Sequence, residues 1–90
     1  MTNAQEWLDK WYPKEGGCLR GKGLHNSNFG KKRSEIEKLY IKKQNLEGSL
    51  DLSDFVNLEE LICFYNKLTS LNLNNCKKLK RINCTNPVIR

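Results

Sequence analysis

The sequence repeats itself with a period of 21 to 22 residues. The run LEELICFYNKL, which begins at Leu58, recurs as LKRINCTNPVI from Leu79 and appears earlier as IEKLYIKKQNL from Ile36. Apolar residues hold the same offsets in all three copies. A short period with fixed apolar offsets is typical of stacked units, each of which buries its apolar side against its neighbours. The repeat therefore predicts the architecture of residues 36–89 and leaves the partner open.

Each copy is expected to contribute one short strand, near residues 38–42, 60–64 and 81–84. Successive strands should pair in parallel about 4.8 Å apart, which gives a three-strand sheet. Asn66 stands where a buried side-chain amide would bond the turning backbone of adjacent repeats. The extra residue of the first period is predicted within residues 47–49, where Gly48 permits a local kink.

The motif L-x-x-L-x-C-x-x-N-x-L-T-S-L-N-L-x-x-C, from Leu58 to Cys76, resembles the short class of leucine-rich repeats. The opening stretch 4–14, followed by residues 33–36, also resembles the starts of cytoplasmic fungal leucine-rich-repeat proteins. The resemblance implies an α/β solenoid within one domain of residues 1–90. Its expected parts are an N-terminal capping helix and a short right-handed coil with a three-strand parallel sheet.

The capping helix is predicted at residues 3–12. Its apolar residues follow helical spacing and form one stripe, and Pro13 ends it; they are Ala4, Trp7, Leu8, Trp11 and Tyr12. Thr2 or Asn3 would cap its first turn. The stripe is expected to cover the open end of the first repeat. A membrane-surface or partner helix is the alternative, which its short, non-basic polar face disfavours.

A Gly-rich basic insert separates this helix from the repeats. The chain carries a net charge of +6, and residues 13–34 account for +5 of it. A connection this long without regular structure is usually functional or mobile. Its candidate binding residues are Arg20, Lys22, Lys31, Lys32 and Arg33.

The four cysteines show no paired zinc-type spacing. Cys63 and Cys84 share the offset of Ile41 and are expected to be core residues within disulfide reach. We expect them to be reduced, since no export signal or membrane-spanning run is recognisable and the cytoplasm is the expected compartment. Cys18 has no packing explanation and is expected to be the reactive thiol.

The outward positions of the strands supply a candidate recognition surface of aromatic and basic residues. Its members are Tyr40, Lys42, Lys43, Ile62, Phe64, Tyr65 and Arg81. The alternative is that the helix or the insert folds over this sheet. Three strands span only about 10 Å, so the strip suits a short peptide, or needs the insert or a second copy of the chain.

Three function classes follow from these residues. The first is non-catalytic interaction with a protein or peptide, including a homodimer formed through the uncapped last repeat at Leu79, Ile82 and Cys84. The second is binding of nucleic acid or another polyanion through the insert, aided by Lys42 and Lys43. The third is a metal-binding or redox module that uses Cys18 and His25. No catalytic constellation is recognisable, so no enzyme, cofactor, metal or membrane partner is expected.

Overall fold

The computed structural model describes residues 2–25, 27–41 and 43–84. The strand β1 (Thr2–Asn3) leads directly into the helix α1 (Ala4–Trp11). Asn3 caps the helix, because its side-chain Oδ1 accepts a hydrogen bond from the Glu6 N–H at 3.0 Å. Ala4, Leu8 and Tyr12 form the buried side of the predicted stripe, so α1 is held to the body by its apolar face.

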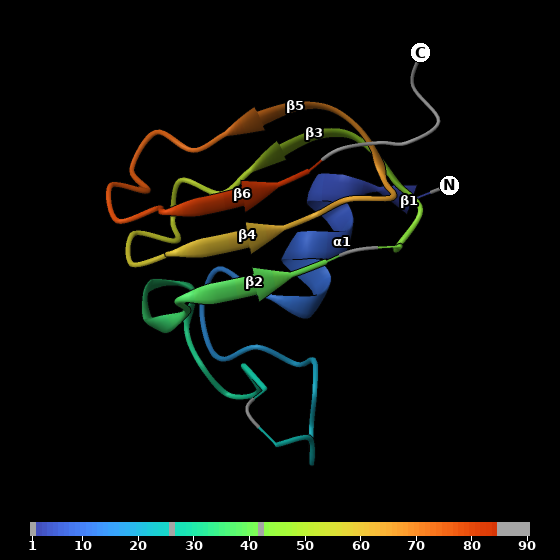
Figure 1. Cartoon of the computed structure of the whole chain (residues 1–90). Coiled ribbons are helices and arrows are strands. Elements are labelled where there is room, and N and C mark those ends of the chain that lie inside the picture. Colours follow the sequence, from blue (N-terminus) through green and yellow to red (C-terminus); the bar gives the residue numbers. More distant parts are fainter. Residues whose placement is uncertain (1, 26, 42, 85–90) are drawn as a thin grey trace.

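Two parallel sheets follow, and their strands alternate along the chain (Figure 1). One sheet has the order β2-β4-β6 and consists of β2 (Lys38–Tyr40), β4 (Glu60–Ile62) and β6 (Arg81–Asn83). The other has the order β1-β3-β5, with β3 (Leu46–Asp51) and β5 (Lys67–Asn72). A short 3-10 helix, η1 (Arg33–Glu35), precedes β2.

The predicted solenoid with a single three-strand sheet is wrong. The described residues form a small α/β structure with one α-helix and two separate three-stranded parallel sheets. The second sheet escaped prediction because Gly48 interrupts the apolar alternation between Leu46 and Leu50, and Leu68 and Leu71 are three residues apart, so neither run shows the alternation that signals a strand. Residues 85–89, the end of the predicted repeat region, lie outside the described residues.

The ladder between β3 and β5 is irregular at the predicted place, but for another reason. Its register shifts between Gly48 and Ser49, so that Thr69 of β5 has no partner. The extra residue at this point therefore lies on β5 and not within residues 47–49. The extra length of the first repeat relative to the second lies earlier, in the turn between β2 and β3. Lys43 and Asn45 in this turn have positive φ angles of 60° and 56°.

The core is built from equivalent positions of successive repeats, and it opens toward the third. Leu39, Leu61 and Ile82 are register partners across β2, β4 and β6, yet their exposed fractions are 0%, 0% and 51%. The leucines of β5 and the following segment are likewise only partly buried and pack against the core; they are Leu68, Leu71, Leu73 and Leu79. We call these four leucines and Ile82 the open end.

Asn66 bonds the backbone of two repeats, as the sequence predicts. Its Oδ1 accepts from the N–H groups of Gln44 and Leu46 at 3.1 and 3.0 Å, and its Nδ2 donates to the carbonyl of Ile41 at 2.7 Å. Nδ2 also lies 3.2 Å from the carbonyl of Cys63 within its own repeat. The buried amide therefore fixes the turn after β2 against the turn after β4.

Candidate functional site

The strands of sheet β2-β4-β6 carry three of the seven predicted recognition residues, Tyr40, Ile62 and Arg81. Tyr40 and Ile62 are register partners, and Tyr40 is 50% exposed. Glu60 lies between two members of the face: it accepts a hydrogen bond from the Tyr40 hydroxyl at 2.9 Å and lies 3.8 Å from Arg81. We call Tyr40, Ile62, Phe64, Tyr65, Lys43 and Arg81 the recognition face.

Glu60 also affects the pKa of its aromatic neighbour. The hydrogen bond to the Glu60 carboxylate, together with some burial and the negative charge, raises the pKa of Tyr40 above its ordinary value. A phenol is uncharged at neutral pH even at its ordinary pKa, so Tyr40 keeps the proton that it donates to Glu60. The edge of the ring is thus anchored while its faces remain available for contact.

The turn after β4 extends the recognition face. Phe64 and Tyr65 pack edge to face with their ring centroids 5.0 Å apart, and the Lys43 ammonium lies 5.2 Å from the Tyr65 ring centroid. Tyr65 has a positive φ of 64° and is 48% exposed. Lys42, which the sequence also assigned to this surface, lies outside the described residues.

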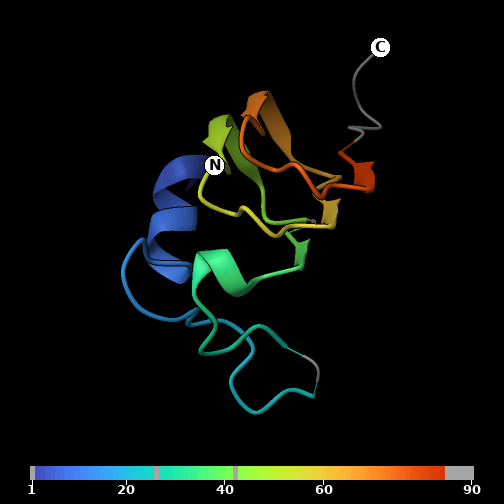
Figure 2. The same ribbon diagram turned by 90° about the vertical axis from the view of Figure 1, so that its left-hand side faces the viewer.

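Neither the helix nor the insert lies over the recognition face within the described part of the chain. Figures 1 and 2 show α1 behind the sheets, where it contacts β3 and β1. The insert lies beside β2 at the edge of the sheet and projects away from the body (Figures 1 and 2). The insert therefore covers the edge of the sheet at β2, and it does not fold over the recognition face as the alternative interpretation of the sequence expected.

The insert is closed into a loop at its base. The N–H of Cys18 donates to the Lys31 carbonyl at 2.8 Å, and the N–H of Gly30 donates to the Cys18 carbonyl at 2.9 Å. Gly17 permits this closure, since a Cβ at that position would lie 2.4 Å from the Gly30 carbonyl oxygen. Residues 19–25 and 27–28 are therefore presented by a fixed base.

Two of the five basic insert residues are used inside the molecule. Arg33 is buried and donates to the Tyr12 carbonyl at 2.7 Å, to Asp9 at 2.8 Å and to Asp54 at 3.2 Å. Arg20 stacks over Trp7, with its guanidinium carbon 4.9 Å from the ring centroid. Of these five residues, Lys22, Lys31 and Lys32 are left exposed.

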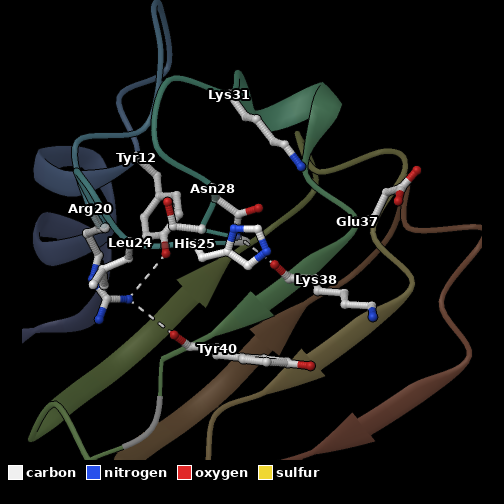
Figure 3. Close-up of a pocket in the computed structure, with 11 residues that line it drawn as sticks. Tyr12, Arg20, Leu24, His25, Asn28, Lys31, Glu37, Lys38 and Tyr40 are labelled. Carbon is white, nitrogen blue, oxygen red and sulfur yellow. Dashed lines mark hydrogen bonds between the residues drawn. The ribbon is translucent and has the colours of Figure 1, made fainter.

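A pocket lies between the insert and the free edge of β2 (Figure 3). Two insert side chains bond the carbonyls of that edge: Asn28 donates to Lys38 at 2.8 Å, and Arg20 donates to Tyr40 at 3.1 Å. These bonds replace those of a neighbouring strand and protect the edge. The space between them has a volume of about 380 Å³. We call it the insert pocket. Its lining residues are Tyr12, Arg20, Gly21, Leu24, His25, Ser27, Asn28, Lys31, Glu37, Lys38 and Tyr40.

Most of the insert pocket was not predicted. Arg20 and Lys31 were assigned to the basic insert and Tyr40 to the sheet, but no sequence signal places them together. The available signal was the length of the insert, because long connections in small domains are often functional. The side-chain bonds of Arg20 and Asn28 to the strand edge depend on tertiary packing alone.

The structure differs from the sequence-based expectation for three of the cysteines. Cys63 and Cys84, which were expected to be reduced, form a disulfide with their Cα atoms 4.5 Å apart. Cys18, expected to be reactive, is only 2% exposed, so it lacks the solvent access that a reactive thiol needs. The described residues contain no group of three or more His, Cys, Asp or Glu side chains that would hold a metal ion.

Comparison with protein-family models, with curated proteins and with solved structures found no match to this chain. The likeness to leucine-rich repeats therefore stays a sequence-based prediction. Among the helices formed by the described residues, none has the length and apolar character needed to cross a membrane.

Proposed function

We propose that this chain is a non-catalytic protein-binding module that holds a short extended peptide segment on the recognition face. The observation that carries the proposal is the pair of register partners Tyr40 and Ile62, which stand on an outer sheet face left open by the described parts of the helix and the insert. Large aromatic and aliphatic side chains of this kind are the usual anchors of protein interfaces.

The size and charge of the face favour a peptide over a globular partner. Three strands span about 10 Å, whereas a standard globular interface buries about 800 Å² on each side. The cations of Lys43 and Arg81 flank the centre formed by Tyr40 and Ile62. The Glu60 carboxylate lies between Tyr40 and Arg81. The preferred segment is therefore apolar at its centre and carries acidic residues beside it.

Selection from a random phage-displayed peptide library tests this proposal. The wild-type chain should enrich a consensus of apolar and acidic residues, and a synthetic peptide of that consensus should bind in solution. The double variant Tyr40→Ala and Ile62→Ala should weaken binding at least tenfold, because it removes both central anchors. Val56→Ala is the matched control, since Val56 is 42% exposed but lies outside the recognition face. The absence of a consensus, or equal losses in both variants, would refute the proposal.

The polyanion alternative is tested in the same format. Single-stranded DNA binding measured by anisotropy at several salt concentrations would reveal phosphate contacts as a steep loss of affinity. With Arg20 and Arg33 engaged inside the fold, three of the five candidate basic residues remain for such contacts. We therefore expect weak binding with a shallow salt dependence, and a slope near that of six phosphate contacts would favour nucleic acid over peptide.

Self-association is a second candidate, and the open end is the observation that favours it. Within the described part of the chain, β5 and β6 are the outermost strands on this side, and the five apolar residues of the open end are only partly covered. A second copy placed on the same surface would bury these residues in a two-fold contact. Light scattering after size exclusion should give a dimer that Ile82→Lys converts to a monomer. Leu24→Lys, on the insert, is the control, and a monomer at high wild-type concentration would remove this candidate.

We also propose that the chain acts in the cytoplasm, on the strength of the resemblance to cytoplasmic fungal repeat proteins. Thiols of that compartment are generally kept reduced, so Cys63 and Cys84 would be a dithiol there. Rapid acid quenching of cells followed by alkylation and mass spectrometry tests this location. Recovery of an oxidised Cys63–Cys84 pair from the quenched cells would count against the cytoplasm.

A further inference from the structure

We propose that the insert pocket is a binding site for a small molecule that joins an oxyanion, a carboxylate or a phosphate, to an apolar group. This site is separate from the recognition face and does not depend on peptide binding there. Its volume of about 380 Å³ lies within the range of small-molecule sites.

The charges around the insert pocket favour an anion. Its lining carries the cations of Arg20, Lys31 and Lys38 against the single carboxylate of Glu37. Lys31 extends over the pocket from one side and Arg20 lies on the other, whereas the Glu37 carboxylate and the Lys38 ammonium both point away from these side chains (Figure 3). An anion entering the pocket would therefore meet positive charge on more than one side.

Tyr12 keeps the wall free of a second negative charge. Burial is the main reason that the pKa of Tyr12 is raised above its ordinary value, and it outweighs the opposing effect of the Arg20 guanidinium. The phenol is therefore neutral at physiological pH. Its oxygen accepts a hydrogen bond from Arg20 Nη1 at 3.2 Å, which holds the guanidinium in place beside the pocket.

The strand edge supplies a backbone donor. Ile41 donates its N–H to the Ile62 carbonyl of β4 at 2.8 Å. Successive residues of a strand direct their backbone groups to opposite edges, so the N–H and the carbonyl of Tyr40 point to the other edge of β2, on the side of the pocket. The Tyr40 carbonyl accepts from Arg20, but its N–H has no acceptor among residues 2–25, 27–41 and 43–84. A carboxylate or phosphate oxygen is a suitable partner for such an amide next to a lysine.

The rim of the insert pocket supplies the apolar contact. Leu24 is 69% exposed on the insert and lies across the pocket from the β2 edge (Figure 3). A ligand with an aromatic ring would cover Leu24 and replace water there. This contact distinguishes the proposed ligand from a bare inorganic anion, which would use the charges alone.

NMR titration of the isotope-labelled full chain tests the proposal, with benzoate, phenyl phosphate, inorganic phosphate and neutral benzyl alcohol as probes at constant ionic strength. Amide shifts should concentrate at Gly21, Asn28 and Tyr40. Benzoate or phenyl phosphate should bind at least several-fold more tightly than inorganic phosphate, and the stronger of the two identifies the oxyanion. Binding of benzyl alcohol as tight as that of benzoate would overturn the proposal, because it would show that the charge is not used.

Two lysines of the insert provide matched variants. Lys31→Ala removes a cation that lines the pocket and should weaken the best probe about tenfold. Lys22→Ala removes an exposed lysine that does not line it and should leave the affinity unchanged. Both side chains are exposed, so both variants should fold. Equal weakening in the two variants, or shifts scattered over lysines of the whole surface, would show nonspecific attraction and overturn the proposal.

Discussion

The guanidinium of Arg33 lies 2.8 Å from the carboxylate of Asp9, so the last part of the insert is fixed to α1. The same guanidinium reaches Asp54 at 3.2 Å in the segment after β3. Its Nε donates to the Tyr12 carbonyl, and its carbon lies 5.4 Å from the Phe55 ring centroid. One buried cation therefore joins the helix, the insert and the first repeat.

This arrangement predicts a loss of stability in acid. Burial by itself would raise the pKa of the Asp9 carboxyl, but hydrogen bonds from Arg33 and Gln5 and the charge of Arg33 hold that pKa below its ordinary value of 3.8. A carboxyl with a lowered folded-state pKa stabilises the fold above its unfolded-state pKa, and this contribution is lost as the pH falls through the folded-state pKa. The free energy of unfolding from urea titrations should therefore decline below about pH 4.

Arg33→Met should remove much of the decline in unfolding free energy at acid pH. At neutral pH it should lower the free energy of unfolding by about 2 kcal/mol, which is less than for a fully buried ion pair because the carboxylates of Asp9 and Asp54 are partly exposed. Lys32→Met is the matched control, since it removes the same charge from the exposed neighbouring residue. If the two variants showed the same stability and the same pH profile, the buried contacts of Arg33 would have no special role.

Asn66→Ala should destabilise the chain by about 2–4 kcal/mol, because it leaves buried backbone groups of two repeats without partners. The groups affected include the N–H of Leu46 and the carbonyl of Ile41. Thermal and urea unfolding measure the effect. Asn75→Ala, at an exposed turn position, should change the free energy of unfolding by less than about 0.5 kcal/mol. A small effect at position 66 would mean that water replaces the amide.

The Cys63–Cys84 disulfide predicts a stability that depends on reductant. It links residues 21 apart, and closing a loop of that length stabilises a fold by about 3 kcal/mol. Reductant should lower the unfolding midpoint of the wild type but not that of a Cys63→Ala, Cys84→Ala double variant. Alkylation of the unfolded, unreduced chain should modify Cys18 and Cys76 alone. Modification of all four cysteines under these conditions would show that the bond is absent.

Gly17→Ala should open the base of the insert. The added Cβ would meet backbone atoms of Gly30, which cannot move without breaking the bonds that Cys18 makes to residues 30 and 31. Amide hydrogen exchange at Cys18 and Gly30 should become faster by at least tenfold. Gly23→Ala is the comparison, since its φ of 81° is unfavourable for alanine but its Cβ would meet no atom within 4 Å. Equal protection in both variants would contradict the tight closure.

Local signals sufficed for several elements of this fold. The helical stripe and the Asn3 cap placed α1, and the repeated L-x-x-L core placed the three strands of one sheet to within two residues, because these patterns arise from contacts between near neighbours. Asn66 was recognisable because a polar residue at a buried repeat offset must bond the backbone. Tyr40, Ile62 and Arg81 of the recognition face followed from the same strands, as residues that alternate with the buried ones.

The amino-acid pattern was enough to place the register of β2, β4 and β6 and the buried positions Leu39 and Leu61. Tertiary structure alone decided the second sheet, the burial of Arg33 and the packing of the insert against the edge of β2. These features depend on partners far apart in the chain, such as Arg33 with Asp9 and Asn28 with Lys38. The residue type at one position does not specify such partners. An arginine or asparagine side chain can bond water equally well, and it is buried only where the folded chain places a carbonyl or a carboxylate within reach.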